Sequence, residues 1–122
     1  SLAIQIFLID IDPPVLISRL TRVEFASAIA RWVRMTELNE AEAGLIENAF
    51  TNDIKSGLLL AQSLSPSHFN QAEKWISSKR TRLRTLDALH LACSGSSEAE
   101  MITCDKILHQ SAKQLGISSR LL

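Results

Sequence analysis

Hydrophobic positions recur along the chain in two patterns, short apolar runs and longer segments with helical spacing. The runs at residues 15–18, 58–64 and 101–104 are short and are followed by polar residues, which is typical of buried strands. The segments at residues 20–35 and 39–55 place apolar side chains three and four positions apart, which predicts helices. Strands that alternate with helices on short connections predict a mostly parallel sheet.

Residues with capping preferences mark the other helices. Ser65, followed by a proline, predicts the start of a helix over residues 66–78. Further helices are expected at residues 86–93 and 106–115, and Gly116 is a typical stop for the second.

The sequence pattern assigns secondary structure less directly at the two ends of the chain. Residues 2–9 are apolar at almost every position, so periodicity alone allows a buried helix or a strand. Asp12 and the two prolines after it end this segment, because proline has no backbone N–H and restricts the residue before it. Residues 117–122 are expected to form a last edge strand.

The composition indicates one domain of ordinary size, without the excess of positive charge that attracts nucleic acid in general. The chain has 122 residues and is 46% hydrophobic, which is enough for a single core. Basic and acidic residues number 13 each, so the formal net charge is zero and any binding of nucleic acid must use a local patch. Cys93 and Cys104 lack the spacing of a disulfide framework or a zinc site.

No membrane segment is expected. No apolar stretch approaches the roughly 20 residues that a membrane span requires, and the N-terminus lacks the basic start of a secretory signal. Two isolated thiols also suit a reducing compartment. We therefore expect a soluble, cytoplasmic protein.

Two aspartates occupy positions where parallel sheets bind ligands. Asp105 directly follows the predicted strand at residues 101–104, and Asp87 lies in the first turn of a predicted helix. Ligands bind at the carboxyl ends of parallel strands, where helix N-termini gather. Each aspartate also has a simpler interpretation as a capping or first-turn residue, which helices favour.

Glu24 is a third candidate. Its neighbours are apolar and its helix is expected to be largely buried, where an ionised carboxylate needs a partner. The alternative is a solvated stripe that Glu24 shares with Ser27 and Arg31. If Glu24, Asp87 and Asp105 meet, their repulsion calls for a cation, and an all-carboxylate site suits magnesium or manganese. The implied chemistry is metal-assisted hydrolysis of phosphodiesters.

Three motifs carry a family resemblance. Residues 18–25 read Ser-Arg-Leu-Thr-Arg-Val-Glu-Phe, residues 86–92 read Leu-Asp-Ala-Leu-His-Leu-Ala, and residues 102–106 read Ile-Thr-Cys-Asp-Lys, with Leu-Gly-Ile at residues 115–117. In this order they resemble the PIN-domain ribonucleases, and most of all the VapC-type toxins of bacterial toxin–antitoxin pairs. The similarity extends from residue 15 over nearly the whole chain.

The resemblance implies a fold and a metal centre. The fold would be a three-layer α/β/α sandwich with a central, mostly parallel sheet of about four to five strands. One PIN-like domain would span residues 1–122. The family's acidic quartet binds Mg2+ or Mn2+ and cleaves RNA, and Glu24, Asp87 and Asp105 match three of its four positions.

The fourth position belongs to an aspartate of an Asp-x-Ser motif at the end of the family's first strand. The segment that starts at Ser1 resembles the residues just after that aspartate, so we expect the domain to lack this strand and its acid. Asp10 and Asp12 are poor substitutes, because their position before the prolines suits the far end of the first helix.

Other residues have secondary roles in this interpretation. Thr103 is a candidate for holding a metal-bound water and His90 for reaching the cleft, although a structural threonine and a packed histidine are the simpler interpretations. Basic residues that could neutralise RNA phosphates along the approach are Arg19, Arg22, Lys79, Arg80, Arg82 and Arg84. A solvated loop is the alternative for the last four.

The leading functional hypothesis is a metal-dependent endoribonuclease of the toxin type. The resemblance implies an RNA substrate, a cognate antitoxin protein and a homodimer. The alternative is a PIN-like domain that has lost catalysis, for want of the first aspartate, and binds protein or RNA. A DNA-directed nuclease shares the acidic chemistry, but the chain lacks the extra helices of that class.

Overall fold

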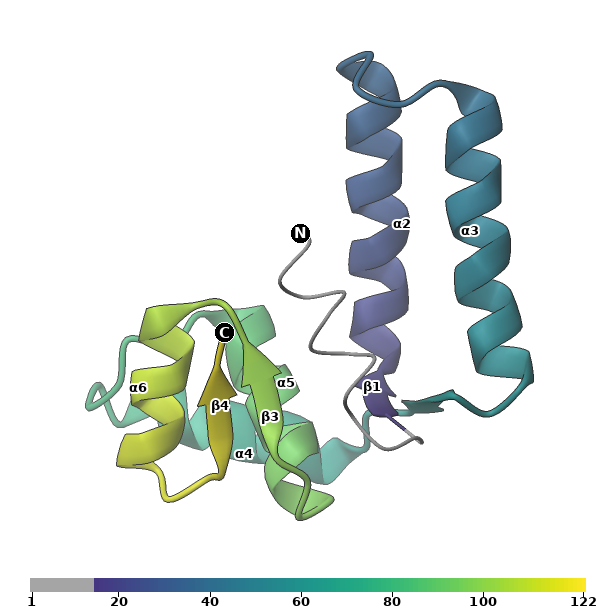
Figure 1. Ribbon diagram of the computed structural model, residues 1–122. Helices are drawn as coiled ribbons and strands as arrows, with labels where there is room; N and C mark the ends of the chain where they lie inside the picture. The colour runs from purple at the N-terminus through teal and green to yellow at the C-terminus, as the bar shows by residue number, and fades with distance from the viewer. Residues whose placement is uncertain (1–14) are drawn as a thin grey trace. The chain divides into compact units, whose positions relative to one another are not determined.

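The computed structural model describes residues 15–122, which form a mixed α/β protein. One or two helices separate successive strands along the chain, and all strand pairings are parallel, as the sequence predicts (Figure 1). The apolar segment at residues 2–9, Asp10, Asp12 and the two prolines lie outside the described residues. The elements are β1 (Val15–Ser18), α2 (Arg19–Arg34), α3 (Glu40–Lys55), β2 (Leu59–Gln62), α4 (Pro66–Ser77), α5 (Thr85–Ser96), β3 (Met101–Thr103), α6 (Lys106–Gln114) and β4 (Ser119–Leu121).

Contacts divide the chain into two compact units, whose described parts are residues 15–62 and 63–122. Each unit holds one pair of parallel strands, β1 with β2 and β3 with β4. The prediction of one domain over residues 1–122 stays a prediction.

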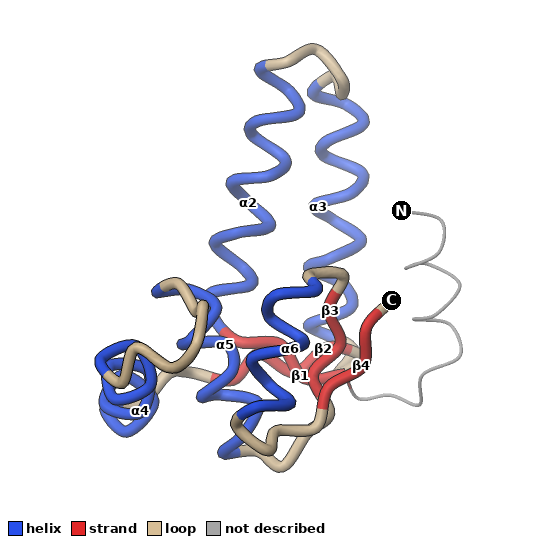
Figure 2. The backbone as a smooth tube through the Cα atoms, turned by 90° about the vertical axis from the view of Figure 1, so that its left-hand side faces the viewer, coloured by secondary structure: helices blue, strands red, loops and turns tan. Residues whose placement is uncertain are grey.

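The unit of residues 15–62 is a helical hairpin between two parallel strands. Val15 pairs with Leu59 and Ser18 with Gln62, so β1 and β2 are fully in register. Helices α2 and α3 run side by side in both views (Figures 1 and 2). The rings of Phe25 and Phe50 stack between them, with centroids 4.0 Å apart. This aromatic contact fixes which sides of the two helices face each other.

Helix α3 begins with a reciprocal cap. The backbone N–H of Glu42 donates to Oδ1 of Asn39 at 2.8 Å, and the backbone N–H of Asn39 donates to Oε1 of Glu42 at 3.1 Å. Two of the N–H groups that a helix start leaves without a partner are thereby satisfied.

The expectation that α2 is largely buried is wrong. Ile29 is the only buried residue of this helix, and Ala43 is the only buried residue of α3. The apolar residues of α2 surround the helix instead of forming one stripe, so packing against a single neighbouring helix covers only part of them.

The unit of residues 63–122 contains the larger core. Helices α4 and α5 pack on each other, and α6 lies against β3 and β4. Gly95 in the last turn of α5 allows close approach, because a Cβ there would lie 3.3 Å from Cδ1 of Ile117. The buried apolar residues of this unit are Ala72, Leu83, Ala88, Leu89, Leu91, Ala92, Cys93, Leu108 and Ala112.

Helix α5 is longer than the segment 86–93 that the sequence predicts. Serine hydroxyls support the extra turn: Ser96 Oγ donates to the carbonyl of Cys93 at 3.0 Å, and Ser97 Oγ donates to the same oxygen at 2.9 Å. The carbonyls of a last helical turn otherwise lack partners. Hydrophobic periodicity cannot reveal such polar support.

His68 joins the start of α4 to the end of α5. It is 6% exposed, and its Nδ1 accepts the backbone N–H of Ser65 at 3.0 Å. Because Nδ1 is then an acceptor, Nε2 carries the proton and donates to Ser96 Oγ at 2.7 Å. A single buried side chain thus caps one helix and holds a second.

Replacing His68 by alanine should lower the free energy of unfolding by about 1–3 kcal/mol, because the backbone N–H of Ser65 and the hydroxyl of Ser96 would lose their hydrogen bonds to this buried ring. Urea denaturation followed by circular dichroism measures the change. Asn70→Ala on the exposed side of α4 is the control and should change stability by less than about 0.5 kcal/mol. Equal effects of the two substitutions would contradict this role of His68.

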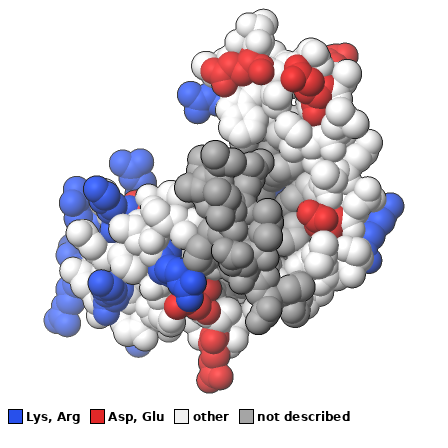
Figure 3. All heavy atoms as spheres, viewed as in Figure 1, with Lys and Arg blue, Asp and Glu red and all other residues white. Residues whose placement is uncertain are grey.

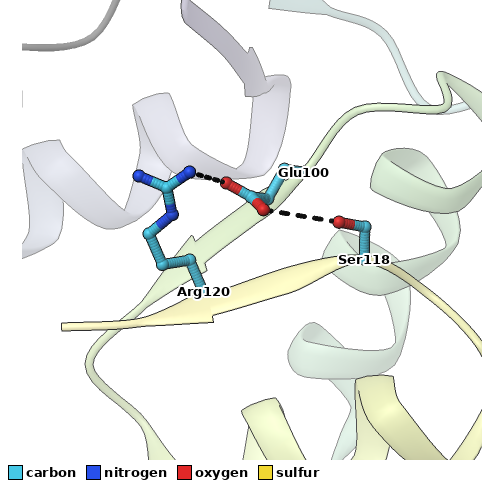
Figure 4. Close-up of polar contacts among 3 residues, drawn as sticks. All are labelled: Glu100, Ser118 and Arg120. Carbon is cyan, nitrogen blue, oxygen red and sulfur yellow. Dashed lines mark hydrogen bonds and ion pairs between the residues drawn. The ribbon is translucent and has the colours of Figure 1, made fainter.

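Strand β4 is tied to the start of β3 by side chains (Figure 4). Arg120 Nη2 lies 2.8 Å from Oε1 of Glu100, and Ser118 Oγ donates to Oε2 of Glu100 at 3.5 Å. This ion pair is solvent-exposed and contributes at most about 1 kcal/mol. Its role is to favour the register in which Met101 pairs with Ser119.

Each of the five described helices is followed by a residue with positive φ just beyond its C-cap. Two of these residues are Gly57 and Gly116, for which this conformation carries no steric penalty. The other three are Thr36, Lys79 and Glu98, with φ between 54° and 60°. The left-handed turn therefore ends the helices even where glycine is absent.

Candidate active site

Asp87 is presented by the first turn of α5. This helix buries Ala88, Leu89 and Leu91, which fixes its orientation in the unit and leaves Asp87 half-buried. The helix dipole favours a carboxylate at this end. His90 lies one turn further along and is also half-buried. Asp87 and His90 each interact with at least one other group.

Asp105 forms the N-cap of α6. Its Oδ1 accepts the backbone N–H groups of Ile107 at 2.9 Å and Leu108 at 3.2 Å. Its own backbone N–H donates to Oγ1 of Thr103 at 3.0 Å. The simpler interpretation of Asp105 as a capping residue is therefore confirmed, and the Thr103 hydroxyl orders the turn between β3 and α6.

Capping uses only one oxygen of the Asp105 carboxylate. No described residue forms a hydrogen bond with its Oδ2, and the side chain is exposed. The two hydrogen bonds to Oδ1 hold the carboxylate in one orientation, which a metal ligand requires. The same residue can therefore cap the helix and offer an oxygen to a cation.

Glu24 lies on α2 and is exposed. It belongs to the unit of residues 15–62, whereas Asp87 and Asp105 belong to the unit of residues 63–122. Among residues 15–122, no group of three His, Cys, Asp or Glu side chains is close enough to hold a metal ion. The convergence of Glu24, Asp87 and Asp105 stays a prediction.

A basic loop connects α4 to α5. Leu83 is only 8% exposed and anchors the loop to the core, whereas Arg82 and Arg84 on either side of it are exposed. Lys79 and Arg80 are also exposed. Alternation about one buried leucine therefore directs cationic side chains to solvent immediately before α5. The sequence identifies the charges, but the anchoring role of Leu83 emerges only from the structure.

Positive charge is concentrated in residues 63–122. This segment has eight Lys and Arg residues and five Asp and Glu residues, a formal surplus of three, although the whole chain is neutral. Figure 3 shows many Lys and Arg side chains on the surface of this unit. Arg19 and Arg22 are exposed on α2 and belong to the other unit.

The two cysteines differ in environment. Cys93 is buried in α5, and desolvation by burial raises the pKa of its thiol. Cys104 is exposed. Because a raised pKa keeps Cys93 protonated at neutral pH, this thiol acts as a small apolar core residue.

Comparison with known families identifies the fold. The PIN domain profile matches residues 3–114. The chain belongs to the PIN-domain family. No curated protein matches the sequence. PIN domains are typically nucleases and generally use divalent metal ions. The short parallel strands and five described helices are consistent with the α/β/α fold of a PIN domain.

Within residues 15–122, no helix has the length and the apolar character required to cross a bilayer.

The donor chemistry of the candidate residues suits a hard cation. Asp87, Asp105 and Glu24 offer carboxylate oxygens, which magnesium and manganese prefer. Cys104 is next to Asp105 and is exposed, but no further Cys or His joins it in a metal-binding group among the described residues. Carboxylates therefore fit the divalent ions that the family generally uses.

Proposed function

We propose that this PIN domain is a metal-dependent endoribonuclease of the VapC toxin type. The observation that carries the proposal is the PIN-domain match over residues 3–114, which includes all three candidate acids. Asp87 in the first turn of α5 and Asp105 in the turn between β3 and α6 occupy the kinds of position where parallel sheets bind ligands.

In this proposal Glu24, Asp87 and Asp105 hold Mg2+ or Mn2+. When bound, the ion lowers the pKa of a water and stabilises the charge that develops on the phosphoryl group. The hydrogen bonds from α6 to Asp105 keep its carboxylate oriented, so little reorganisation is needed on binding. Thr103 and His90 are proposed to position water or substrate beside the acids.

The basic loop is proposed as the path of the RNA backbone. Lys79, Arg80, Arg82 and Arg84 are exposed and lie immediately before the helix that carries Asp87. Neutralising four phosphates of a single strand would make the logarithm of affinity fall with the logarithm of salt, with a slope of roughly −3. Arg19 and Arg22 would contribute further contacts to phosphates.

The proposed regulator is a cognate antitoxin protein. An acidic cluster attracts a basic side chain, so an antitoxin peptide that places Arg or Lys there would compete with the metal and with RNA. Control of this kind suits a small nuclease whose activity would harm the cell.

The proposal is tested by incubating the purified protein with a panel of structured and single-stranded RNAs, in manganese, in magnesium and in chelator. We expect cleavage products only with a divalent ion, and identical DNA sequences should remain intact. RNA cleavage that persists in chelator would contradict the metal-dependent mechanism. Cleavage of DNA with RNA intact would favour the DNA-directed class.

The alternative is a PIN domain that binds RNA without cutting it. The observation that favours it is the basic loop, whose cations need no metal to attract phosphates. A filter-binding measurement in chelator on the same RNAs distinguishes the two functions. Salt-sensitive binding without cleavage in any metal would support the binding module and reject the nuclease.

A further inference from the structure

Many of the lysines and arginines occupy positions that the fold itself favours. The C-terminal end of a helix carries partial negative charge, so a cation in the last turn stabilises the helix. Four of the five described helices have cations there, which are Arg31, Arg34, Lys55, Lys74 and Lys113. Arg120 of β4 is paired with Glu100. These six cations therefore have a structural role.

Four other cations lie near the starts of helices, where the helix dipole disfavours positive charge. Arg19 is the first residue of α2, and Arg22 follows three residues later. Arg84 is the N-cap of α5, and Lys106 is the first residue of α6. The remaining three cations of the chain precede Arg84 in the basic loop. Helix stability does not account for the four at the helix starts.

The helices that start with a cation are the helices that present the candidate acids. Glu24 lies on α2, Asp87 lies in the first turn of α5, and Asp105 is the N-cap of α6. The other two helices start without a cation: α3 has two acids in its first turn, and α4 has a serine cap and a proline. Residues that oppose local stability are expected at functional sites. Cations beside the acids therefore indicate the binding of an anion.

Lys106 directly follows a candidate ligand in the chain. It is exposed, and its side chain forms no hydrogen bond or ion pair with another of residues 15–122. Asp105, the residue before it, uses Oδ1 to cap α6 and has no described partner for Oδ2. The ammonium group and this carboxylate oxygen therefore extend from the same turn. A lysine binds phosphate as a point charge on a flexible stem.

We propose that Lys106 binds a phosphate of the RNA backbone next to Asp105. The inference rests on the proposed function, because it takes RNA as the ligand of the candidate active site. The RNA strand then has one set of contacts in the basic loop before α5 and another at the start of α6. These are the starts of the two helices that present Asp87 and Asp105. Lys106 is therefore a substrate-binding residue on a different element from the basic loop.

The first test compares Lys106→Met with Lys113→Met, which removes an exposed lysine from the other end of the same helix. Affinity for a single-stranded RNA is measured in chelator over a series of salt concentrations. The acids repel RNA equally in all these proteins, so the comparison isolates the lysine. Lys106→Met should bind about three- to tenfold more weakly at low salt, with a salt slope shallower by about 0.7. Lys113→Met should match the wild type, and Lys106→Arg should keep most of the affinity.

Cleavage and thermal melting supply two further measurements. Lys106→Met should raise KM while leaving kcat nearly unchanged, because the contact is equally strong in the bound substrate and in the transition state. The melting temperature should not fall, since the substitution removes a cation from the positive end of the helix dipole. Lys113→Met should lower it by a few degrees, because that cation lies at the negative end.

The outcomes separate this proposal from the nuclease itself. If no metal supports cleavage but Lys106→Met still loses affinity and salt slope, the nuclease is rejected and the phosphate contact stands. If RNA is cleaved and Lys106→Met has the wild-type affinity, salt slope and KM, the contact is refuted and the nuclease stands. Equal losses in Lys106→Met and Lys113→Met would refute the contact in favour of general charge attraction. A lower melting temperature of Lys106→Met, with unchanged salt slope, would assign the lysine to the fold instead. A wild type that neither binds nor cleaves RNA would reject both proposals.

Discussion

Asp87→Asn should reduce RNA cleavage in manganese by roughly 100-fold or more, which is the scale of losing one group that stabilises charge in an enzyme's transition state. The substitution removes one negative charge and one anionic oxygen ligand while keeping the size of the side chain. Manganese affinity should fall in parallel, because a neutral amide is a weaker ligand than a carboxylate for a hard cation. Calorimetric titration of manganese and a cleavage assay measure the two effects.

Two further variants make the result specific. Glu73→Gln changes an exposed acid on α4 and should leave metal affinity and cleavage unchanged. Asp105→Asn keeps a side-chain oxygen that can cap α6 but loses the charge, so it should impair metal binding with little loss of stability. Equal manganese affinity in wild-type and Asp87→Asn protein would reject Asp87 as a ligand.

Leu91→Ala should cost about 2–5 kcal/mol of unfolding free energy. Leu91 is the largest fully buried side chain among the described residues, at 0% exposure, and lies in the middle of α5. Truncation leaves a cavity that close-packed neighbours fill only in part. For a domain with a total stability of about 5–15 kcal/mol, this is a large fraction, and urea denaturation measures it directly.

The matched control is Leu86→Ala in the same helix. Leu86 is 45% exposed, so the same deletion of atoms should cost less than about 1.5 kcal/mol. Similar losses at both positions would show that burial in α5 does not determine stability. A large loss at Leu91 alone would identify α5 as the centre of its unit, with Asp87 on a rigid support.

Local elements of the PIN domain follow closely from sequence. The apolar runs predict four parallel strands, and the structure confirms them with shorter bounds for β2, β3 and β4. Capping signals predict the start of α4 at Pro66 and the start of α6 after Asp105. These features depend on residues that are close together in the sequence, so one amino-acid sequence is enough to predict them.

Burial of individual side chains is harder to predict from the sequence than the helices and strands are. The apolar composition of α2 predicts a buried helix, but only Ile29 is buried, because composition does not say how many neighbours a helix has. His68 shows the same limit for polar residues. Its partner Ser96 is 28 positions away, and no local pattern connects the two side chains.

For the candidate site, too, the sequence predicts local roles better than contacts between distant residues. Sequence predicts Asp105 both as a cap and as a ligand, and the hydrogen bonds to Ile107 and Leu108 confirm the first role without opposing the second. Motif order assigns Glu24, Asp87 and Asp105 to one centre. That assignment is a long-range relation between two units, so it remains a prediction that metal titration must decide.

The left-handed turns after the helices have a consequence for heat resistance. At Thr36, Lys79 and Glu98 a side chain occupies a conformation that costs a non-glycine residue roughly 1–2 kcal/mol. Each kcal/mol corresponds to roughly 2–8 °C in the melting temperature of a domain of this size. All three positions lie outside the helices that they end, away from Asp87 and Asp105 in sequence. Glycine at Thr36 and at Glu98 should therefore raise the melting temperature without changing any candidate site residue, whereas glycine at Lys79 would also remove one cation of the basic loop.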